Sequence, residues 1–254
     1  MKFASLGSGS EGNALLVSGR ETMVLLDCGF GLNDTLRRLA RLNVSPEQLS
    51  AIVVTHEHGD HLGGVLKLAR KYQLPVWLSH GSLRSLAGKF TGLTIHEINP
   101  LQNFAIHDLE VTPYPVPHDA AEPLQFVFGD GAFRLGVLTD SGSSTPHIEQ
   151  TLTGCDALIL ECNHDSRMLH NGKYPYSLKQ RVGGRFGHLN NTEAAGILQR
   201  LDVSRLQHLV AAHLSQSNNT PELAVQALSN ALDCAAEWIC VATQAEGFSW
   251  REIS

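Results

Sequence analysis

The amino-terminal part of the chain alternates between short apolar runs and turns. We expect three consecutive β-strands there, over residues 2–6, 13–17 and 23–26. Leucines then recur at helical spacing from Leu32, which predicts an amphipathic helix with Asn33 as its N-cap. The pattern continues with a buried type of strand over 51–55, a polar turn and an amphipathic stretch over 62–72.

The carboxy-terminal part follows a similar order. Strands and hairpins are expected over 93–139, with Gly129-Asp130-Gly131 as a turn. Alternating elements are then expected at 157–160, 192–201, 209–212 and 220–231. Two halves, each with adjacent antiparallel strands, predict an α/β fold with mixed sheets that pack together under helices. No linker or charge block divides the chain, so we expect residues 1–254 to form a single domain.

Composition narrows the class of protein. A hydrophobic content of 43% with 17% charged residues excludes a disordered chain or a coiled coil. The net charge of −6 argues against a protein that coats nucleic acid through bulk positive charge. The five cysteines form no C-x-x-C pair, and no apolar run is long enough for a membrane span, so we expect a soluble cytoplasmic protein. Thirteen histidines favour metal binding or proton transfer.

The glycine-rich segment over residues 7–12 matches the spacing of a dinucleotide-binding loop. That role requires a helix to begin at the third glycine, yet the apolar run over 13–17 is typical of a strand. We therefore expect a tight hairpin loop, and the sequence leaves its relation to a functional site open.

The strongest chemical signal lies in the segment Thr55-His56-Glu57-His58-Gly59-Asp60-His61. On an extended segment that leaves a strand, His56 and His58 point the same way. After a turn at Gly59, Asp60 and His61 can face a second position. This density of ligand-type side chains fits a pair of adjacent metal ions better than one tetrahedral ion.

This T-H-x-H-x-D-H signature closely resembles the metallo-β-lactamase superfamily of binuclear metal hydrolases. Four further segments resemble other motifs of that family: Leu25-Leu26-Asp27-Cys28-Gly29, Pro117-His118-Asp119, Leu138-Thr139-Asp140-Ser141-Gly142 and Ala211-Ala212-His213-Leu214-Ser215. The resemblance covers the whole chain. It implies a four-layer αββα sandwich with the metal ions at one edge of the paired sheets.

Within the superfamily, the chain resembles the YycJ (WalJ) group most, over residues 118–123, 161–165 and 213–219. Members of that group are regarded as metal-dependent 5′→3′ exonucleases on DNA. The resemblance thus implies a phosphodiesterase that uses a metal-bridging hydroxide. A small-molecule cyclic phosphodiesterase of the PhnP type is one alternative, and a non-catalytic metal-binding carrier on the same fold is another.

Two sets of metal ligands and one bridging residue are expected: His56, His58 and His118; Asp60, His61 and His213; and Asp140 between them. Imidazole-rich ligation without thiolates suits zinc, and the two carboxylates make manganese a competitor. Two divalent ions against two carboxylates and a hydroxide leave net positive charge, which favours an anionic phosphodiester over a neutral amide.

Four other residues have expected roles beside the ligands. Asp27 either accepts a hydrogen bond from a ligand histidine or caps a buried turn. Glu57 is expected to point away into solvent. His188 heads a stretch similar to one in ribonuclease Z, where a histidine meets the phosphate and donates a proton to the leaving oxygen. Glu161 occupies the place of the glutamate that orients it. The sequence assigns no role to His164.

Residues 166–192 contain no acidic residue. The segment is basic, with Arg167, Lys173, Lys179, Arg181 and Arg185. We expect its cations, Lys179, Arg181 and Arg185 among them, to contact a DNA substrate, and Tyr174 and Tyr176 to stack on bases. Strand polarity, the native metal and the oligomeric state stay open.

Overall fold

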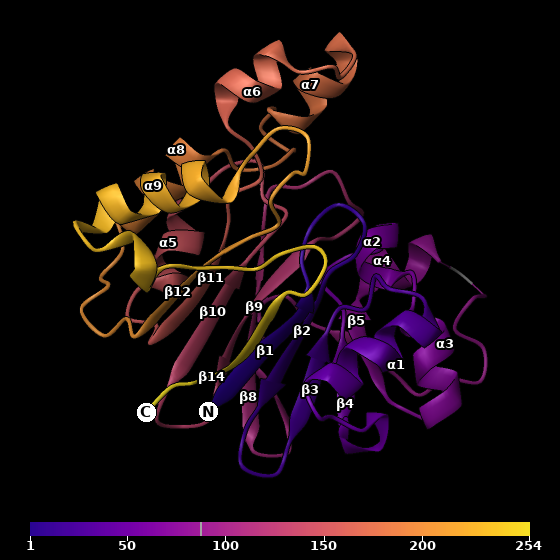
Figure 1. The fold of residues 1–254 in the computed structure, drawn as a ribbon. Coiled ribbons are helices and arrows are strands. Elements are labelled where there is room, and N and C mark those ends of the chain that lie inside the picture. The colour runs from indigo at the N-terminus through magenta and orange to yellow at the C-terminus, as the bar shows by residue number, and fades with distance from the viewer. Residues whose placement is uncertain (87) are drawn as a thin grey trace.

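Two seven-stranded β-sheets lie at the centre of the fold (Figure 1). The structure is a computed structural model that describes residues 1–86 and 88–254. The first sheet has the order β14(Phe248–Glu252)-β1(Lys2–Gly7)-β2(Ala14–Ser18)-β3(Met23–Leu26)-β4(Ala51–Val53)-β5(Val76–Ser79)-β6(Ile95–Ile98). Strands β1 to β3 are antiparallel neighbours, whereas β3 to β6 are parallel.

The second sheet repeats this arrangement. Its order is β13(Cys240–Val241)-β12(His208–Ala212)-β11(Ala157–Glu161)-β10(Arg134–Leu138)-β9(Leu124–Gly129)-β8(Leu109–Pro115)-β7(Phe104–Ile106). Strands β7 to β10 are antiparallel and β10 to β13 are parallel. The expected α/β fold with two mixed sheets is confirmed.

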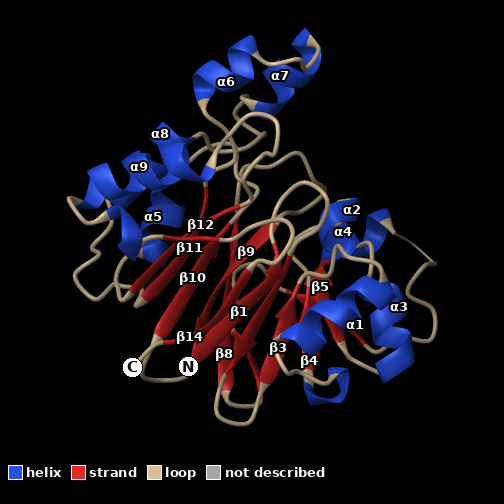
Figure 2. Ribbon diagram, viewed as in Figure 1, coloured by secondary structure: helices blue, strands red, loops and turns tan. Residues whose placement is uncertain are grey.

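Helices cover the outer face of each sheet (Figure 2). The first sheet carries α1(Leu32–Arg41), α3(Val65–Tyr72) and α4(His80–Ser85), and the second carries α5(Pro146–Leu152), α8(Asn191–Leu198) and α9(Pro221–Leu232). Three short helices lie nearer the upper edge: α2(Gly59–Leu62), α6(Ser166–Asn171) and α7(Tyr176–Val182). The 3-10 turns are η1(Pro46–Gln48) and η2(Ala236–Trp238). The described part of the chain contains no helix with the length and hydropathy of a membrane span.

Three apolar layers hold these elements together. Phe3, Val53 and Phe126 belong to the layer between the sheets, where both sheets contribute side chains. Leu25 faces the helices outside the first sheet, and Leu138 faces those outside the second. Because strands such as β3 bury both faces, their sequences are continuously apolar, as expected for sheets covered on both sides.

One local prediction, the N-cap at Asn33, was wrong. Helix α1 is capped by Gly31, whose extended backbone places its carbonyl to accept from the Thr35 amide at 2.9 Å, so Asn33 lies inside the helix. The amphipathic segment expected over 62–72 forms α3, and only its first residue, Leu62, belongs to the preceding short helix α2. At Gly64 a Cβ atom would lie 1.9 Å from the Phe30 carbonyl oxygen, so the chain passes too close there for any larger residue.

Candidate metal centre and active site

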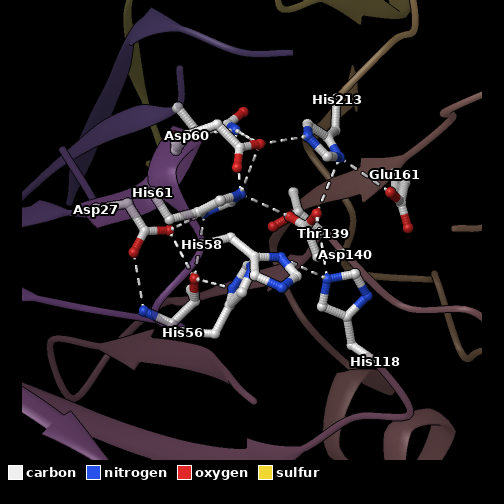
Figure 3. Close-up of polar contacts among 12 residues, drawn as sticks. Asp27, His56, His58, Asp60, His61, His118, Thr139, Asp140, Glu161 and His213 are labelled. Atoms are coloured by element: carbon white, nitrogen blue, oxygen red, sulfur yellow. Dashed lines mark hydrogen bonds and ion pairs between the residues drawn. The ribbon is translucent and has the colours of Figure 1, made fainter. Parts of the chain in front are cut away.

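The candidate site lies at the edge where the carboxyl ends of β3, β4, β10, β11 and β12 meet, below α6 and α7 (Figure 1). Parallel strands place their carboxyl ends at one edge, so the loops that follow them converge although they are far apart in sequence. Figure 3 shows the histidines of these loops pointing toward one another around Asp140.

The first donor set consists of His56, His58 and His118, whose ligand-type atoms lie within 4.8 Å of one another. His118 directs its Nδ1 to the Gly187 carbonyl oxygen at 3.0 Å, which leaves its Nε2 facing inward, 3.3 Å from His58 Nδ1. His56 is 1% exposed, and its Nε2 has no hydrogen-bond partner among the described residues.

The second donor set consists of Asp60, His61 and His213. Asp60 Oδ2 lies 3.5 Å from His61 Nε2 and 3.6 Å from His213 Nε2. The structure therefore brings the expected ligands into the two expected groups. Asp60 and His61 belong to the short helix α2, which follows directly after His58 of the first group.

Asp140 lies between the two sets (Figure 3). One carboxylate oxygen is 3.0 Å from His61 Nε2, and the other is 3.9 Å from His118 Nε2. Asp140, Asp27 and His213 all have left-handed backbones, with φ of 48°, 59° and 56°. Such conformations are uncommon outside glycine and concentrate at functional sites, because the surrounding structure must hold them there.

The donor set fits divalent cations. His56 Nε2 and His213 Nε2 are buried without a hydrogen-bond partner among the described residues, which is costly unless another group binds them. Burial opposes a charged imidazole, yet the Asp140 carboxylate raises the pKa of His61 well above its usual range and that of His213 to about 10. The site thus concentrates negative charge that cations would balance, through nitrogen and oxygen donors suited to such ions.

Asp27 lies beside the ligand candidate His61 (Figure 3). Its carboxylate accepts from the Thr55 amide at 2.8 Å and from the Thr55 hydroxyl at 2.9 Å, and it lies 2.8 Å from His61 Nδ1. This contact directs His61 Nε2 toward the donor set. At Gly29, a Cβ atom would lie 1.9 Å from the Asp60 carbonyl oxygen, so only glycine allows the two loops this approach.

Glu161 connects His188 to the donor set. It is 0% exposed, and its Oε1 lies 2.8 Å from His188 Nδ1 and 3.0 Å from His213 Nδ1. Burial would raise the pKa of Glu161, but the charge of His188 lowers it to about 2. Burial would lower the pKa of His188, but Glu161 raises it above its ordinary value. With Nδ1 directed to Glu161, the Nε2 of His188 remains for the cleft.

A cleft of about 380 Å³ opens onto the donors, and α7 forms part of its wall. Of the three basic residues expected to bind substrate, Arg181 lines this cleft and pairs with Asp119 at 2.5 Å. Lys179 does not line the cleft and donates to the His170 carbonyl at 2.7 Å. Arg185 does not line it either, and its guanidinium lies over the Phe186 ring.

The expectation that Glu57 points into solvent was wrong. Glu57 is half-buried, and its carboxylate accepts from the Ala121 amide at 2.7 Å and the Ser82 hydroxyl at 2.9 Å. It therefore ties the first histidine motif to the loop that carries His118. The alternation of the motif correctly turns Glu57 away from the ligands, but the sequence gives no sign of its partners.

The glycine-rich loop borders the site. Ser8 Oγ accepts a hydrogen bond from the backbone amide of His213 at 2.9 Å, and the side-chain Nδ2 of Asn13 lies 3.1 Å from His61 Nε2. Strands β1 and β2 pair as the expected hairpin, so this loop holds ligand residues rather than a dinucleotide. No sequence signal identified Ser8 or Asn13, because their partners lie in distant motifs.

The chain is similar to characterised proteins along most of its length. It is 35% identical over 240 residues to exodeoxyribonuclease YycJ of Bacillus anthracis, covering 92% of this chain and 89% of that protein. It is 33% identical to exodeoxyribonuclease WalJ of Streptococcus pneumoniae, covering 91% and 88%. The crystal structure of the metallo-β-lactamase fold protein YhfI from Bacillus subtilis matches with a TM-score of 0.77 at 18% identity, over 99% of each chain.

A family profile described as the beta-lactamase superfamily domain matches residues 22–213, a span that contains both donor sets, Asp140, Glu161 and His188. The fold, the profile and the relatives agree. The chain therefore belongs to the metallo-β-lactamase superfamily, is similar to the YycJ and WalJ exodeoxyribonucleases within it, and is a hydrolase of that fold.

Proposed function

We propose that this protein is a binuclear metal-dependent phosphodiesterase that degrades DNA from the 5′ end. The observation that carries the proposal is the contact of 2.8 Å between buried Glu161 and half-buried His188, placed directly beside two groups of metal-ligand side chains. Metal donors alone would serve many hydrolases. A positioned imidazole beside them adds what cleavage of a phosphodiester needs, a proton for the departing alkoxide.

Two divalent ions are proposed, one in each donor set, with Asp140 shared by both. The ions, when bound, would lower the pKa of a water held between them and stabilise charge on the phosphate. Zinc is the better match to the imidazole donors, with manganese as the competitor. Asp27 and Glu161 support this role, because each fixes the ring orientation of a ligand histidine through its Nδ1.

His188 is proposed to protonate the leaving oxygen. Glu161 keeps the ring oriented, and its negative charge favours the protonated imidazole that this role requires. The side chain is 21% exposed and lines the cleft, so its free nitrogen is accessible to a substrate while its other nitrogen is held.

DNA is proposed as the substrate on two grounds. The relatives at 35% and 33% identity are named exodeoxyribonucleases. The cleft wall beside His188 also carries Arg181 and Tyr174, from the acid-free segment over residues 166–192. A guanidinium and an aromatic ring suit a phosphate backbone and its bases. The 5′→3′ direction rests on the resemblance to the YycJ group.

The test is degradation of end-labelled single-stranded DNA, duplex DNA and RNA, each with zinc or manganese. The proposal predicts early release of a 5′-terminal label as mononucleotide and gradual shortening of 3′-labelled strands. His188→Ala serves as the matched control, because its donor sets are intact. Hydrolysis of a cyclic phosphodiester without any shortening of DNA would instead establish the small-molecule alternative.

A further inference from the structure

A second cavity lies on the opposite side of α7 from the metal cleft. Its volume is about 360 Å³, close to the 380 Å³ of the cleft itself. Leu178, Arg181 and Val182 line the cleft, whereas Tyr176, Lys179 and Gly183 line the second cavity. Residues three or four apart share one face of a helix, so opposite faces of α7 line the two cavities. One short helix therefore separates them.

The chemistry of the second cavity is polar, aromatic and free of carboxylates. The lining includes His164, Leu169, Tyr176, Lys179, Gln180 and Asn190, and no acidic residue belongs to it. Leu169 adds an apolar contact, and Gln180 and Asn190 carry amides that both donate and accept hydrogen bonds. A flat, mostly uncharged group with several hydrogen-bonding atoms matches this lining better than an isolated anion.

His164 has hydrogen-bonding capacity that the described protein does not use. The residue lines the cavity and is 2% exposed, and its Nδ1 has no hydrogen-bond partner among the described residues. Burial lowers the pKa of His164 to about 4, so the imidazole is neutral near pH 7. A buried polar group without a partner is costly, and a ligand with complementary donors and acceptors would offset that cost.

Tyr176 supplies an unusually open aromatic face. It is 77% exposed, although it lines the cavity and is a large, partly apolar side chain. Proteins that bind single strands use such rings as platforms, because every base has a face that stacks on them. Lys179, beside it, has the charge to approach a phosphate of the same strand.

We propose that this second cavity binds one nucleobase of the DNA strand whose scissile phosphate lies in the metal cleft. The inference rests on the proposed nuclease function. Tyr176 stacks on the base, and His164 with the neighbouring amides contacts its edge. The strand then crosses α7, with the reacting phosphate on one side of the helix and a seated base on the other.

The test removes one base at a time. In a labelled single-stranded oligonucleotide, each nucleotide near the cleaved end is replaced in turn by an abasic residue, and the rate of cleavage is measured. The wild-type protein should lose about 5- to 150-fold at one particular position, the range expected for one stacked base. That position-specific loss should disappear in Tyr176→Ala and persist in Tyr176→Phe, which keeps the ring.

Trp238→Ala is the matched control, since Trp238 is an exposed aromatic residue in η2 that lines neither cavity. It should keep the wild-type abasic profile. Thermal unfolding of each variant checks the fold. Because Tyr176 is exposed, its substitution should leave the fold intact.

Two failures are distinguishable. If wild-type protein shortens DNA with no abasic-sensitive position, or if Tyr176→Ala keeps the same sensitivity, the base-binding inference is wrong and the nuclease function stands. If wild-type protein hydrolyses bis(p-nitrophenyl) phosphate but shortens no DNA, the proposed function fails and the inference fails with it.

Discussion

Asp27 and Asp140 occupy equivalent places in the two sheets. Each follows the strand that pairs in parallel with the next strand of its sheet, β3 with β4 and β10 with β11. Each is almost fully buried, has a left-handed backbone and precedes a glycine two residues later. At Gly29 and Gly142 a Cβ atom would lie 1.9 Å and 2.4 Å from a backbone oxygen of another segment, so the backbone of a second loop packs closely against each of these loops.

Both carboxylates contact His61, but their other partners differ, and the neighbouring strand of each sheet determines those partners. Beyond β4, Thr55 offers an amide and a hydroxyl that occupy the oxygens of Asp27. At the end of β11, Glu161 is an acceptor that binds the Ser141 amide, so the oxygens of Asp140 stay directed at the histidines. The same strand-end position thus produces a positioning residue in one sheet and a metal-ligand candidate in the other.

The largest expected effect comes from Asp140→Asn. Removal of this carboxylate charge should release bound metal and abolish turnover of bis(p-nitrophenyl) phosphate, since the proposed function has both ions share Asp140. Metal analysis of the purified variant, together with the rate, checks this. Full occupancy with an unchanged rate would show that Asp140 does not bridge the ions.

His188→Ala should lower kcat by about 10²–10⁴-fold, the usual range for the loss of a positioned proton donor. Metal content should be unchanged, because His188 lies outside both proposed sets. Steady-state kinetics and metal analysis on the same sample make the comparison. Loss of an ion from this variant would mean that His188 is a ligand and that His213 has been given the wrong role.

Asp27→Asn should have a smaller effect than Asp140→Asn, and this contrast tests the comparison most sharply. The altered side chain no longer matches the donors of Thr55 and His61, so metal affinity should fall about 10–100-fold, as for other residues that orient a ligand. Titration with a competing chelator measures it. Equal losses in the two variants would remove the distinction between the two carboxylates.

The smallest effect is expected from single cations near the cleft. Arg181→Gln should weaken single-stranded DNA binding and reduce the slope of log K against log salt by about 0.7 for one lost phosphate contact. Arg185→Gln, which alters a residue outside the cleft, should change the slope less. The slopes of the two variants are compared by measuring DNA binding over a series of salt concentrations. Equal changes would show that general surface charge, not the cleft, attracts the strand.

Residue spacing alone predicted only the ligands that lie close together in the sequence. His56 to His61 combine strand alternation with a turn, so their spacing alone indicated metal ligation. His118, Asp140 and His213 were identified through the family resemblance, because each stands on a separate loop and only the pairing of distant strands brings them together.

The helices of the basic segment were not predicted, for a physical reason. Helix α7 buries none of its residues and α6 buries Leu169 alone, so neither has the apolar periodicity that marks a helix in sequence. Opposite faces of α7 line the two cavities, so the second cavity could not be predicted before the position of this helix was known. The partners of Glu57 and Asn13 were not predicted for a related reason, since they lie in segments that are distant in sequence.

The most direct test of the account is the position of metal ions by anomalous X-ray scattering from crystals of the metal-loaded protein. The account predicts two ions, both in contact with Asp140 and neither in contact with Asp27. A single ion, or an ion bound by Asp27, would contradict it.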